Sequence, residues 1–183
     1  MSSPGRPKGK HPSAQHEGNP VRALVVMGVA GCGKSSVGEA IARAEGLPLI
    51  EGDDHHSAEN KARMAAGTPL TDADREGWLA TLGEQLCASP GGAVLTCSAL
   101  KRSYRDRLRA ASPGLRFVFL EISPADAQAR VSARAATHFF STRLVTSQFE
   151  TLEPPTSEPG VLTVDATRPV EDTARQIQRW LHA

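Results

Sequence analysis

The sequence predicts an α/β fold in which a parallel sheet of about five strands is covered on both faces by helices. Two observations carry this prediction. Short apolar runs rich in β-branched residues alternate along the chain with longer segments of helical composition. The first of these runs leads through a glycine-rich turn directly into a helical segment, as expected for a unit of a parallel sheet.

Each expected strand has its own pattern. Residues 23–27 are apolar and β-branched, as in a strand buried on both faces. Residues 47–51 form a short run that ends in an acid, and residues 93–97 are a compact apolar run. Residues 115–122 carry the strongest strand pattern of the chain, and residues 160–165 form the last strand.

Helical patterns separate the strands, and two of them have clear start signals. Thr71 precedes Asp72 and Asp74, which places acids in a first helical turn. Ser123 precedes Pro124, which fits a capping residue followed by an early proline. The expected helices span residues 36–45, 58–66, 72–88, 101–111, 124–135, 141–152 and 170–182.

Length and composition narrow the functional classes. With 183 residues, the chain suits one domain over residues 21–183, and residues 1–20, rich in Pro, Gly, Ser, Lys and His, are expected to form a disordered tail. A net charge of +1 provides no global field for nucleic acid or an acidic membrane. No apolar run approaches membrane-spanning length, and residues 1–20 lack the apolar middle of a signal peptide. The three cysteines, Cys32, Cys87 and Cys97, contain no C-x-x-C pair, which favours a reducing, cytoplasmic location over a disulfide framework or a zinc site.

The most specific motif is a complete phosphate-binding loop, G-x-x-x-x-G-K-[ST], at residues 28–35. Its strand and helix flanks are the context that the motif requires, so the fold is expected to be of the P-loop NTPase type. The loop amides and the next helix N-terminus would face phosphates. Lys34 would lie by the β- and γ-phosphates of ATP, and the Ser35 hydroxyl would ligate Mg²⁺.

Polar residues follow the first three strands, where ligands of a parallel sheet bind. Asp53 and Asp54 could orient and deprotonate an acceptor hydroxyl, whereas Lys101, Arg75 and Arg105 could hold its polar body or cover the migrating charge. His56 could serve in either role. Each residue also has a simpler interpretation: adjacent aspartates commonly cap helices, and the basic residues could form a solvated helix face. Their joint occurrence beside a phosphate loop favours catalysis.

These motifs together resemble the small, single-domain gluconate kinases, which are related to shikimate and nucleotide kinases. The resemblance runs from about Ala23 to the C-terminus. It is carried by Met-Gly-Val-Ala-Gly-Cys-Gly-Lys-Ser at 27–35, Glu-Gly-Asp-Asp-His-His at 51–56, Glu-Asn-Lys-Ala-Arg-Met at 59–64, Gly-Thr-Pro-Leu-Thr-Asp-Ala-Asp-Arg-Glu-Gly-Trp-Leu at 67–79, Cys-Ser-Ala-Leu-Lys-Arg-Ser-Tyr-Arg-Asp at 97–106, His-Phe-Phe at 138–140 and Leu-Val-Thr-Ser-Gln-Phe-Glu-Thr-Leu-Glu at 144–153.

The resemblance implies transfer of the ATP γ-phosphate to the 6-hydroxyl of D-gluconate, with Mg²⁺. It implies that Asp53 contacts the acceptor hydroxyl, that Glu51 lies near the metal through water, and that residues 130–143 form a mobile lid. Arg134 in this lid would meet the phosphates, and Arg130 would stack on adenine. The implied ATP-binding residues are Gly28, Val29, Ala30, Gly31, Cys32, Gly33, Lys34, Ser35, Ser36, Arg130, Arg168 and Pro169. The implied acceptor-binding residues are Asp53, His56, Arg63, Arg75, Ser98, Lys101, Arg105, His138 and Gln148. The family resemblance also suggests a homodimer.

The chain departs from the family pattern at four positions. Glu51 replaces the commoner Asp, Ser57 and Gly77 stand where Pro is usual, and Arg63 stands where Lys is usual. These departures affect the positioning of the acceptor rather than the charge pattern. Two alternatives stay open: a kinase for another small acid or polyol, such as shikimate, and a regulatory module that binds a nucleotide without an acceptor.

Overall fold

A parallel sheet forms the centre of the protein in a computed structural model that describes residues 23–134 and 142–183. Its five strands run in the order β2-β3-β1-β4-β5, and every neighbouring pair is parallel. They are β1 (Ala23–Met27), β2 (Leu49–Glu51), β3 (Ala93–Thr96), β4 (Arg116–Glu121) and β5 (Val161–Asp165). The predicted fold class is confirmed, and the predicted tail lies outside the described residues.

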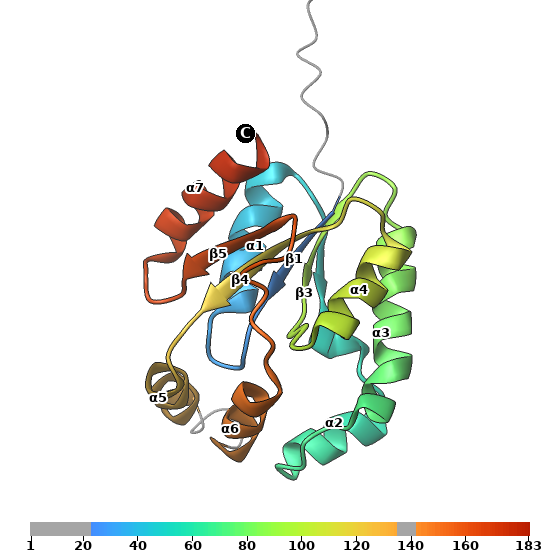
Figure 1. The fold of residues 1–183 in the computed structure, drawn as a ribbon, viewed down its shortest axis with the longest axis vertical. Coiled ribbons are helices and arrows are strands. Elements are labelled where there is room, and N and C mark those ends of the chain that lie inside the picture. Colours follow the sequence, from blue (N-terminus) through green and yellow to red (C-terminus); the bar gives the residue numbers. More distant parts are fainter. Residues whose placement is uncertain (1–22, 135–141) are drawn as a thin grey trace, which may run out of the picture.

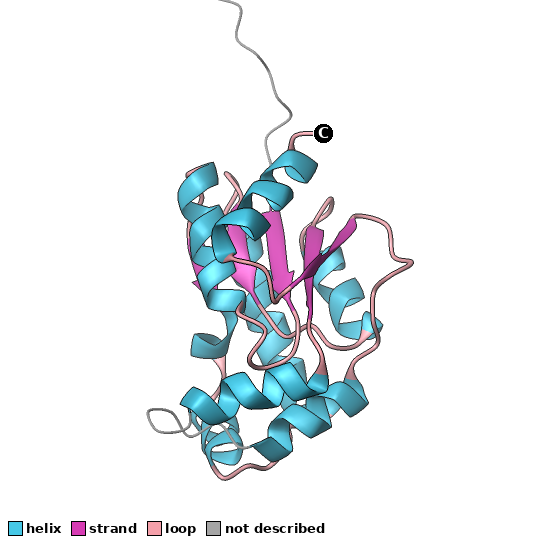
Figure 2. Cartoon of the chain, turned by 90° about the vertical axis from the view of Figure 1, so that its left-hand side faces the viewer, coloured by secondary structure: helices cyan, strands magenta, loops and turns pink. Residues whose placement is uncertain are grey.

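Helices pack on both faces of the sheet (Figures 1 and 2). On one face, α1 (Lys34–Glu45) and α7 (Val170–Leu181) cover a core that contains Leu24 and Val26 of β1. On the other face, α3 (Asp72–Cys87) and α4 (Arg102–Ala111) cover a second core with Val25 and Met27. Because successive strand residues point to opposite faces, the unbroken apolar run of β1 is buried on both sides.

Three further helices lie beyond the carboxyl ends of the strands (Figure 1). They are α2 (Ala58–Ala65), which leads into α3, and the pair α5 (Pro124–Arg134) and α6 (Thr142–Thr151). The chain between β2 and α2 forms a short 3-10 helix, η1 (Gly52–His55), where the sequence predicted only a loop. None of the helices in the described ranges is both long and apolar enough to cross a membrane.

Local signals in the sequence placed most element boundaries within one or two residues. The predicted start of α3 is confirmed by a capping box, in which Thr71 accepts a hydrogen bond from the Asp74 amide and Asp74 accepts one from the Thr71 amide. The first helix was predicted from residue 36 but begins at Lys34, because the last two residues of the phosphate-loop motif already form its first turn.

Candidate active site

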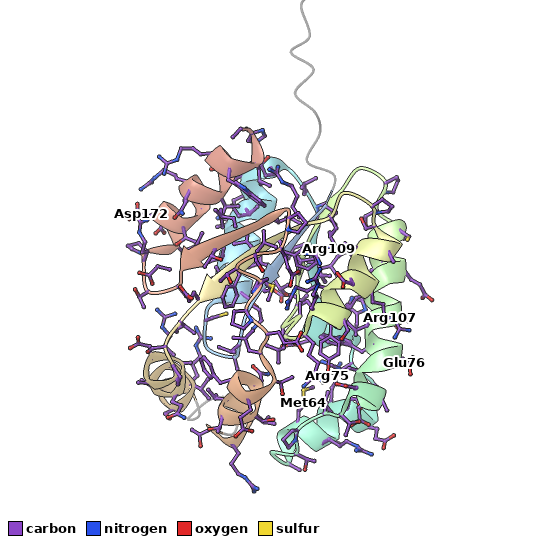
Figure 3. All side chains as sticks on the ribbon, in the orientation of Figure 1. Met64, Arg75, Glu76, Arg107, Arg109 and Asp172 are labelled. Atoms are coloured by element: carbon purple, nitrogen blue, oxygen red, sulfur yellow. The ribbon has the colours of Figure 1, made fainter. Side chains whose placement is uncertain are left out.

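A cavity of about 440 Å³ lies at the carboxyl ends of the central strands. The phosphate loop and the start of α1 form its base, α2 and α3 form one wall, and α5 and α6 form the other. Figure 3 shows Met64 and Arg75 on the sides of α2 and α3 that face α6. The cavity is lined by Ala30, Gly31, Gly33, Lys34, Ser35, Ser36, Asp53, His56, Met64, Leu70, Arg75, Trp78, Ser98, Val131, Arg134 and Gln148.

The phosphate loop leaves the start of α1 open to an anion. Gly33 precedes the helix with φ of 95°, no side chain caps the helix, and no acid lies in its first turn. Its first amides therefore point toward the loop without a partner from a capping side chain. The side chains of Val29 and Cys32 are buried in the core, so only their backbone can serve a ligand. Burial also raises the pKa of the Cys32 thiol, which makes it inert.

Lys34 folds back over the loop. Its Nζ donates to the carbonyl oxygens of Gly28 and Val29, each at 3.1 Å. An ammonium group has three N–H donors, so these two bonds leave the third N–H for a ligand in the cavity. Lys34 lines the cavity, where its charge can meet phosphate oxygens.

Ser35, Glu51 and Thr96 form a short chain of hydrogen bonds beside the loop. The Ser35 hydroxyl donates to Glu51 Oε2 at 3.1 Å, and the Thr96 hydroxyl donates to the same oxygen at 2.5 Å. Hydroxyl and carboxylate oxygens suit Mg²⁺. Among the described residues, no three His, Cys, Asp or Glu side chains come together to hold a metal ion. The Ser35 hydroxyl and the Glu51 carboxylate fit a magnesium ion that also binds phosphate oxygens.

The side of the cavity near η1 and α3 contains two buried polar atoms without a hydrogen-bond partner in the described structure, His56 Nδ1 and Arg75 Nη1. Both residues are 8% exposed and line the cavity. A buried donor without a partner costs free energy, so such atoms indicate a ligand that satisfies them. Asp53, in η1, lies beside them, with its Oδ1 at 3.9 Å from His56 Nε2.

His56 is neutral near pH 7. Its pKa is lowered to about 4, mainly by burial; the Asp53 carboxylate opposes this shift, and the positive charges of Arg75 and Lys61 add to it. The ring stacks on Trp78, with ring centroids 4.1 Å apart. A neutral ring can exchange hydrogen bonds with an acceptor hydroxyl, whereas it carries no positive charge to cover the migrating phosphoryl group.

Arg105 was predicted to bind the acceptor, and the structure contradicts this prediction. Its side chain is 0% exposed and forms an ion pair with Glu158. Its guanidinium also donates to the carbonyl oxygens of Ala99, Leu100 and Glu153. Ala99 has a φ of 45°, a strained value for a residue with a side chain. The hydrogen bonds from Arg105 therefore stabilise a strained loop that follows β3.

Lys101 and Arg63 were also predicted as acceptor ligands, but neither lines the cavity. Lys101 Nζ binds both carboxylate oxygens of Asp72 at 2.9 Å, and Tyr104 donates to the same carboxylate. Arg63 pairs with Glu59 at 2.9 Å and Asp74 at 3.5 Å. Each of these cations is thus paired with a carboxylate of the protein itself, and its role toward the acceptor stays a prediction.

The remaining predicted residues divide between the cavity and its border. Ser98, Arg134 and Gln148 line the cavity, and Gln148 Oε1 accepts a hydrogen bond from the Ala30 amide at 2.6 Å. Arg130 links the phosphate loop to the β5–α7 connection by donating to the carbonyls of Gly31 and Ala166. Arg168 and Pro169 lie in that connection, outside the cavity lining. His138 and part of the predicted lid, residues 135–141, lie outside the described residues.

Several residues of the site were not predicted from the sequence, and two of them, Trp78 and Thr96, form hydrogen bonds there. Trp78 lines the cavity and donates from Nε1 to the carbonyl of Gly52 at 2.7 Å. Its position three residues after Arg75 on one helix face could have revealed it. Thr96 is the polar end of an otherwise apolar strand, beside the predicted loop at 97–101, and this position was a usable signal.

Comparisons with known proteins agree with this geometry. The family described as "AAA domain" matches residues 24–155. A gluconokinase of Gluconobacter oxydans is 41% identical over 166 residues, covering 88% of this chain and 92% of that protein. The thermoresistant gluconokinase of Escherichia coli is 40% identical over 151 residues, covering 80% of this chain and 86% of that protein. The crystal structure of a gluconokinase from Sinorhizobium meliloti superposes with a TM-score of 0.82 at 48% identity and covers 88% of this chain and 92% of that one.

Proposed function

The chain belongs to the gluconokinase family, and we propose that it transfers the γ-phosphate of ATP to the 6-hydroxyl of D-gluconate. The products are 6-phospho-D-gluconate and ADP. The observation that carries the proposal is the pair of buried, unpartnered atoms Arg75 Nη1 and His56 Nδ1, which lie in the same cavity as the phosphate loop. A guanidinium suits a carboxylate, and a neutral imidazole suits a hydroxyl, so the pair fits a polyhydroxy acid.

The phosphate loop binds the nucleotide in this proposal. The open start of α1 supplies backbone amides, and Lys34 adds its third N–H to the β- and γ-phosphates. Ser35 would hold Mg²⁺ directly and Glu51 through water. The ion, when bound, neutralises charge on the phosphates during transfer. Arg130, Arg168 and Pro169 would border the adenine.

The acceptor hydroxyl would be oriented by Asp53. As the oxygen of this hydroxyl bonds to the γ-phosphorus and the bond to the β-phosphate oxygen breaks, the hydroxyl proton passes to the Asp53 carboxylate. Arg75 anchors the distant carboxylate, and this contact fixes which hydroxyl reaches the phosphorus. Arg134 and Gln148 on the opposite wall face the same space, where they would meet the migrating phosphoryl group and help to exclude water.

The direct test is a coupled ADP-release assay with purified protein, ATP, Mg²⁺ and a panel of acceptors that includes D-gluconate and shikimate. We expect turnover to depend on D-gluconate. ATP turnover that is indifferent to D-gluconate would contradict the proposal. Preferential turnover with shikimate would favour the alternative small-acid kinase, and nucleotide binding without turnover on any acceptor would favour a regulatory module.

The role of Arg75 can be tested within the same assay. Arg75→Gln should raise the KM for D-gluconate by roughly 10²-fold, because a charged hydrogen bond to the carboxylate is lost, and should leave the KM for ATP near the wild-type value. Arg43→Gln, on the exposed face of α1, is the matched control and should change neither constant. A homodimer and a cytoplasmic location stay predictions from the sequence and its family resemblance.

A further inference from the structure

We propose that Thr96 is a positioning residue for the magnesium side of this site: its hydroxyl holds the Glu51 carboxylate against Ser35. The inference rests on the proposed function only in that the phosphate loop must bind a magnesium nucleotide. Neither the motif nor the family resemblance pointed to this residue. It lies at the end of β3, between β2 and β1 in the sheet, and is 3% exposed.

The sheet register brings the two side chains together. Glu51 and Thr96 are directly paired across the neighbouring strands β2 and β3. The Thr96 hydroxyl donates to Glu51 Oε2 at 2.5 Å, and Ser35 donates to the same oxygen at 3.1 Å. Two donors thus converge on one carboxylate oxygen, and charge-assisted bonds of this kind are among the stronger ones in proteins.

The rotamer of Thr96 is held from α1. A side-chain carbon added at Gly38 would lie 2.7 Å from Thr96 Cγ2, so the threonine methyl group packs directly onto the helix backbone at this glycine. A β-branched side chain has few choices of χ1. Because the methyl group is held against Gly38, the hydroxyl is left to face Glu51.

The bond to Glu51 determines the orientation of the Ser35 hydroxyl toward a bound magnesium ion. The Ser35 proton is used in the bond to Glu51, which leaves the oxygen lone pairs for the cation. Glu51 has more rotatable bonds than an aspartate and loses more conformational freedom when it is fixed. The hydrogen bond from Thr96 therefore keeps the Glu51 carboxylate and the Ser35 hydroxyl in fixed positions before the nucleotide binds.

The test measures ADP affinity by titration calorimetry, once with Mg²⁺ and once with EDTA. Thr96→Val removes the hydroxyl at nearly constant volume. We expect it to reduce the magnesium-dependent gain in ADP affinity by roughly tenfold, because the free energy of one hydrogen bond to a charged group corresponds to a change of about this size. The affinity measured in EDTA should stay at the wild-type value, because Thr96 acts only on the magnesium side of the site. A merely structural defect would instead lower the ADP affinity both with Mg²⁺ and in EDTA.

Two variants complete the experiment. Thr96→Ser keeps the hydroxyl and should retain most of the gain. Thr163→Val, on strand β5 at the far edge of the sheet, is the matched control and should behave as wild type. If Thr96→Val does not fold, Thr96→Ala carries the same comparison. The inference is overturned if the hydroxyl-free variant keeps the full magnesium gain, or if the serine variant loses as much as the valine variant.

This outcome is separate from that of the proposed function. ADP binding needs no acceptor, so a selective loss of the magnesium gain supports the role of Thr96 whichever acceptor the enzyme uses. An unchanged gain in a protein that phosphorylates D-gluconate removes the role of Thr96 alone.

Discussion

His56 lies flat on Trp78, with the two ring planes inclined by 15°. The same tryptophan donates a hydrogen bond from Nε1 to the carbonyl of Gly52 at 2.7 Å. Gly52 and His56 flank Asp53, the residue assigned to the acceptor hydroxyl. One side chain of α3 therefore contacts both ends of the short segment that contains Asp53, the residue proposed to orient the acceptor hydroxyl.

Replacing Trp78 by Phe should separate these two contacts. The Trp78→Phe variant keeps an aromatic surface for His56 but leaves the Gly52 carbonyl without its donor. We expect a loss of about 1 kcal/mol in the free energy of unfolding, measured by urea denaturation, and a raised KM for D-gluconate with an unchanged KM for ATP. Trp180→Phe, where the ring stacks on Arg116 far from the cavity, is the control. Equal effects of the two variants on the KM for D-gluconate would contradict this role.

The low pKa of His56 predicts a specific loss of stability in mild acid. The ordinary pKa of histidine is 6.5, and that of folded His56 is about 4. Below pH 6.5 the unfolded chain therefore binds a proton that the folded chain does not, and the free energy of unfolding falls until pH approaches 4. This contribution of His56 to the free energy of unfolding is fully present above pH 6.5 and amounts to about 3 kcal/mol.

Urea denaturation between pH 4 and 7 measures this effect. His56→Gln should be less stable at pH 7, because it loses the stacking on Trp78, but its stability should vary less across this range. Hydrogen bonds lower the pKa values of Asp72, Asp74 and Asp165. Protonation of these carboxylates therefore destabilises the fold at a lower pH than protonation of His56 does. A wild-type pH slope that survives in the glutamine variant would show that His56 is not its source.

Asp53→Asn keeps the size of the side chain and removes its capacity to accept a proton. We expect kcat to fall by roughly 10²-fold or more, with little change in the KM for ATP, measured by steady-state kinetics. The side chain is exposed at the cavity, so the thermal unfolding temperature should change little. A variant that lost only ATP affinity would place Asp53 on the nucleotide side instead.

The Arg105–Glu158 pair should matter for stability rather than for acceptor binding. Glu158→Ala leaves a fully buried guanidinium without its charge partner and should cost about 3 kcal/mol or more in the free energy of unfolding. Glu76→Ala removes the carboxylate of a solvent-exposed pair with Arg107 and should cost less than about 0.5 kcal/mol. Folded Glu158→Ala should retain the wild-type KM for D-gluconate. A selective rise in that KM would restore Arg105 to the acceptor site.

The sequence was sufficient where the signal is local. The phosphate loop, the apolar run of β1 and the start of α3 at Thr71 each depend on neighbouring residues alone, and all were correctly predicted. The strand predicted from residue 47 begins only at Leu49, because Pro48 has no N–H for the ladder.

Where the sequence failed, the deciding partner is distant along the chain. Arg105 has the same helical spacing as a surface cation, and only folding brings Glu158 to it, 53 residues later. The pairing of Lys101 with Asp72, which lies 29 residues earlier, is likewise not visible in the local sequence. The link between Thr96 and Glu51 depends on strand register, which no single segment of sequence specifies.

The cavity residues from Asp53 to Trp78, on the side proposed to bind the acceptor, belong to one uninterrupted stretch of chain, whereas the phosphate loop precedes this stretch and α5 and α6 follow much later. Exchange of this stretch between related kinases is thus a practical route to new substrates. A grafted segment that carries its own counterparts of Trp78 and Arg75 would change which small acid is bound and leave the phosphate loop unchanged.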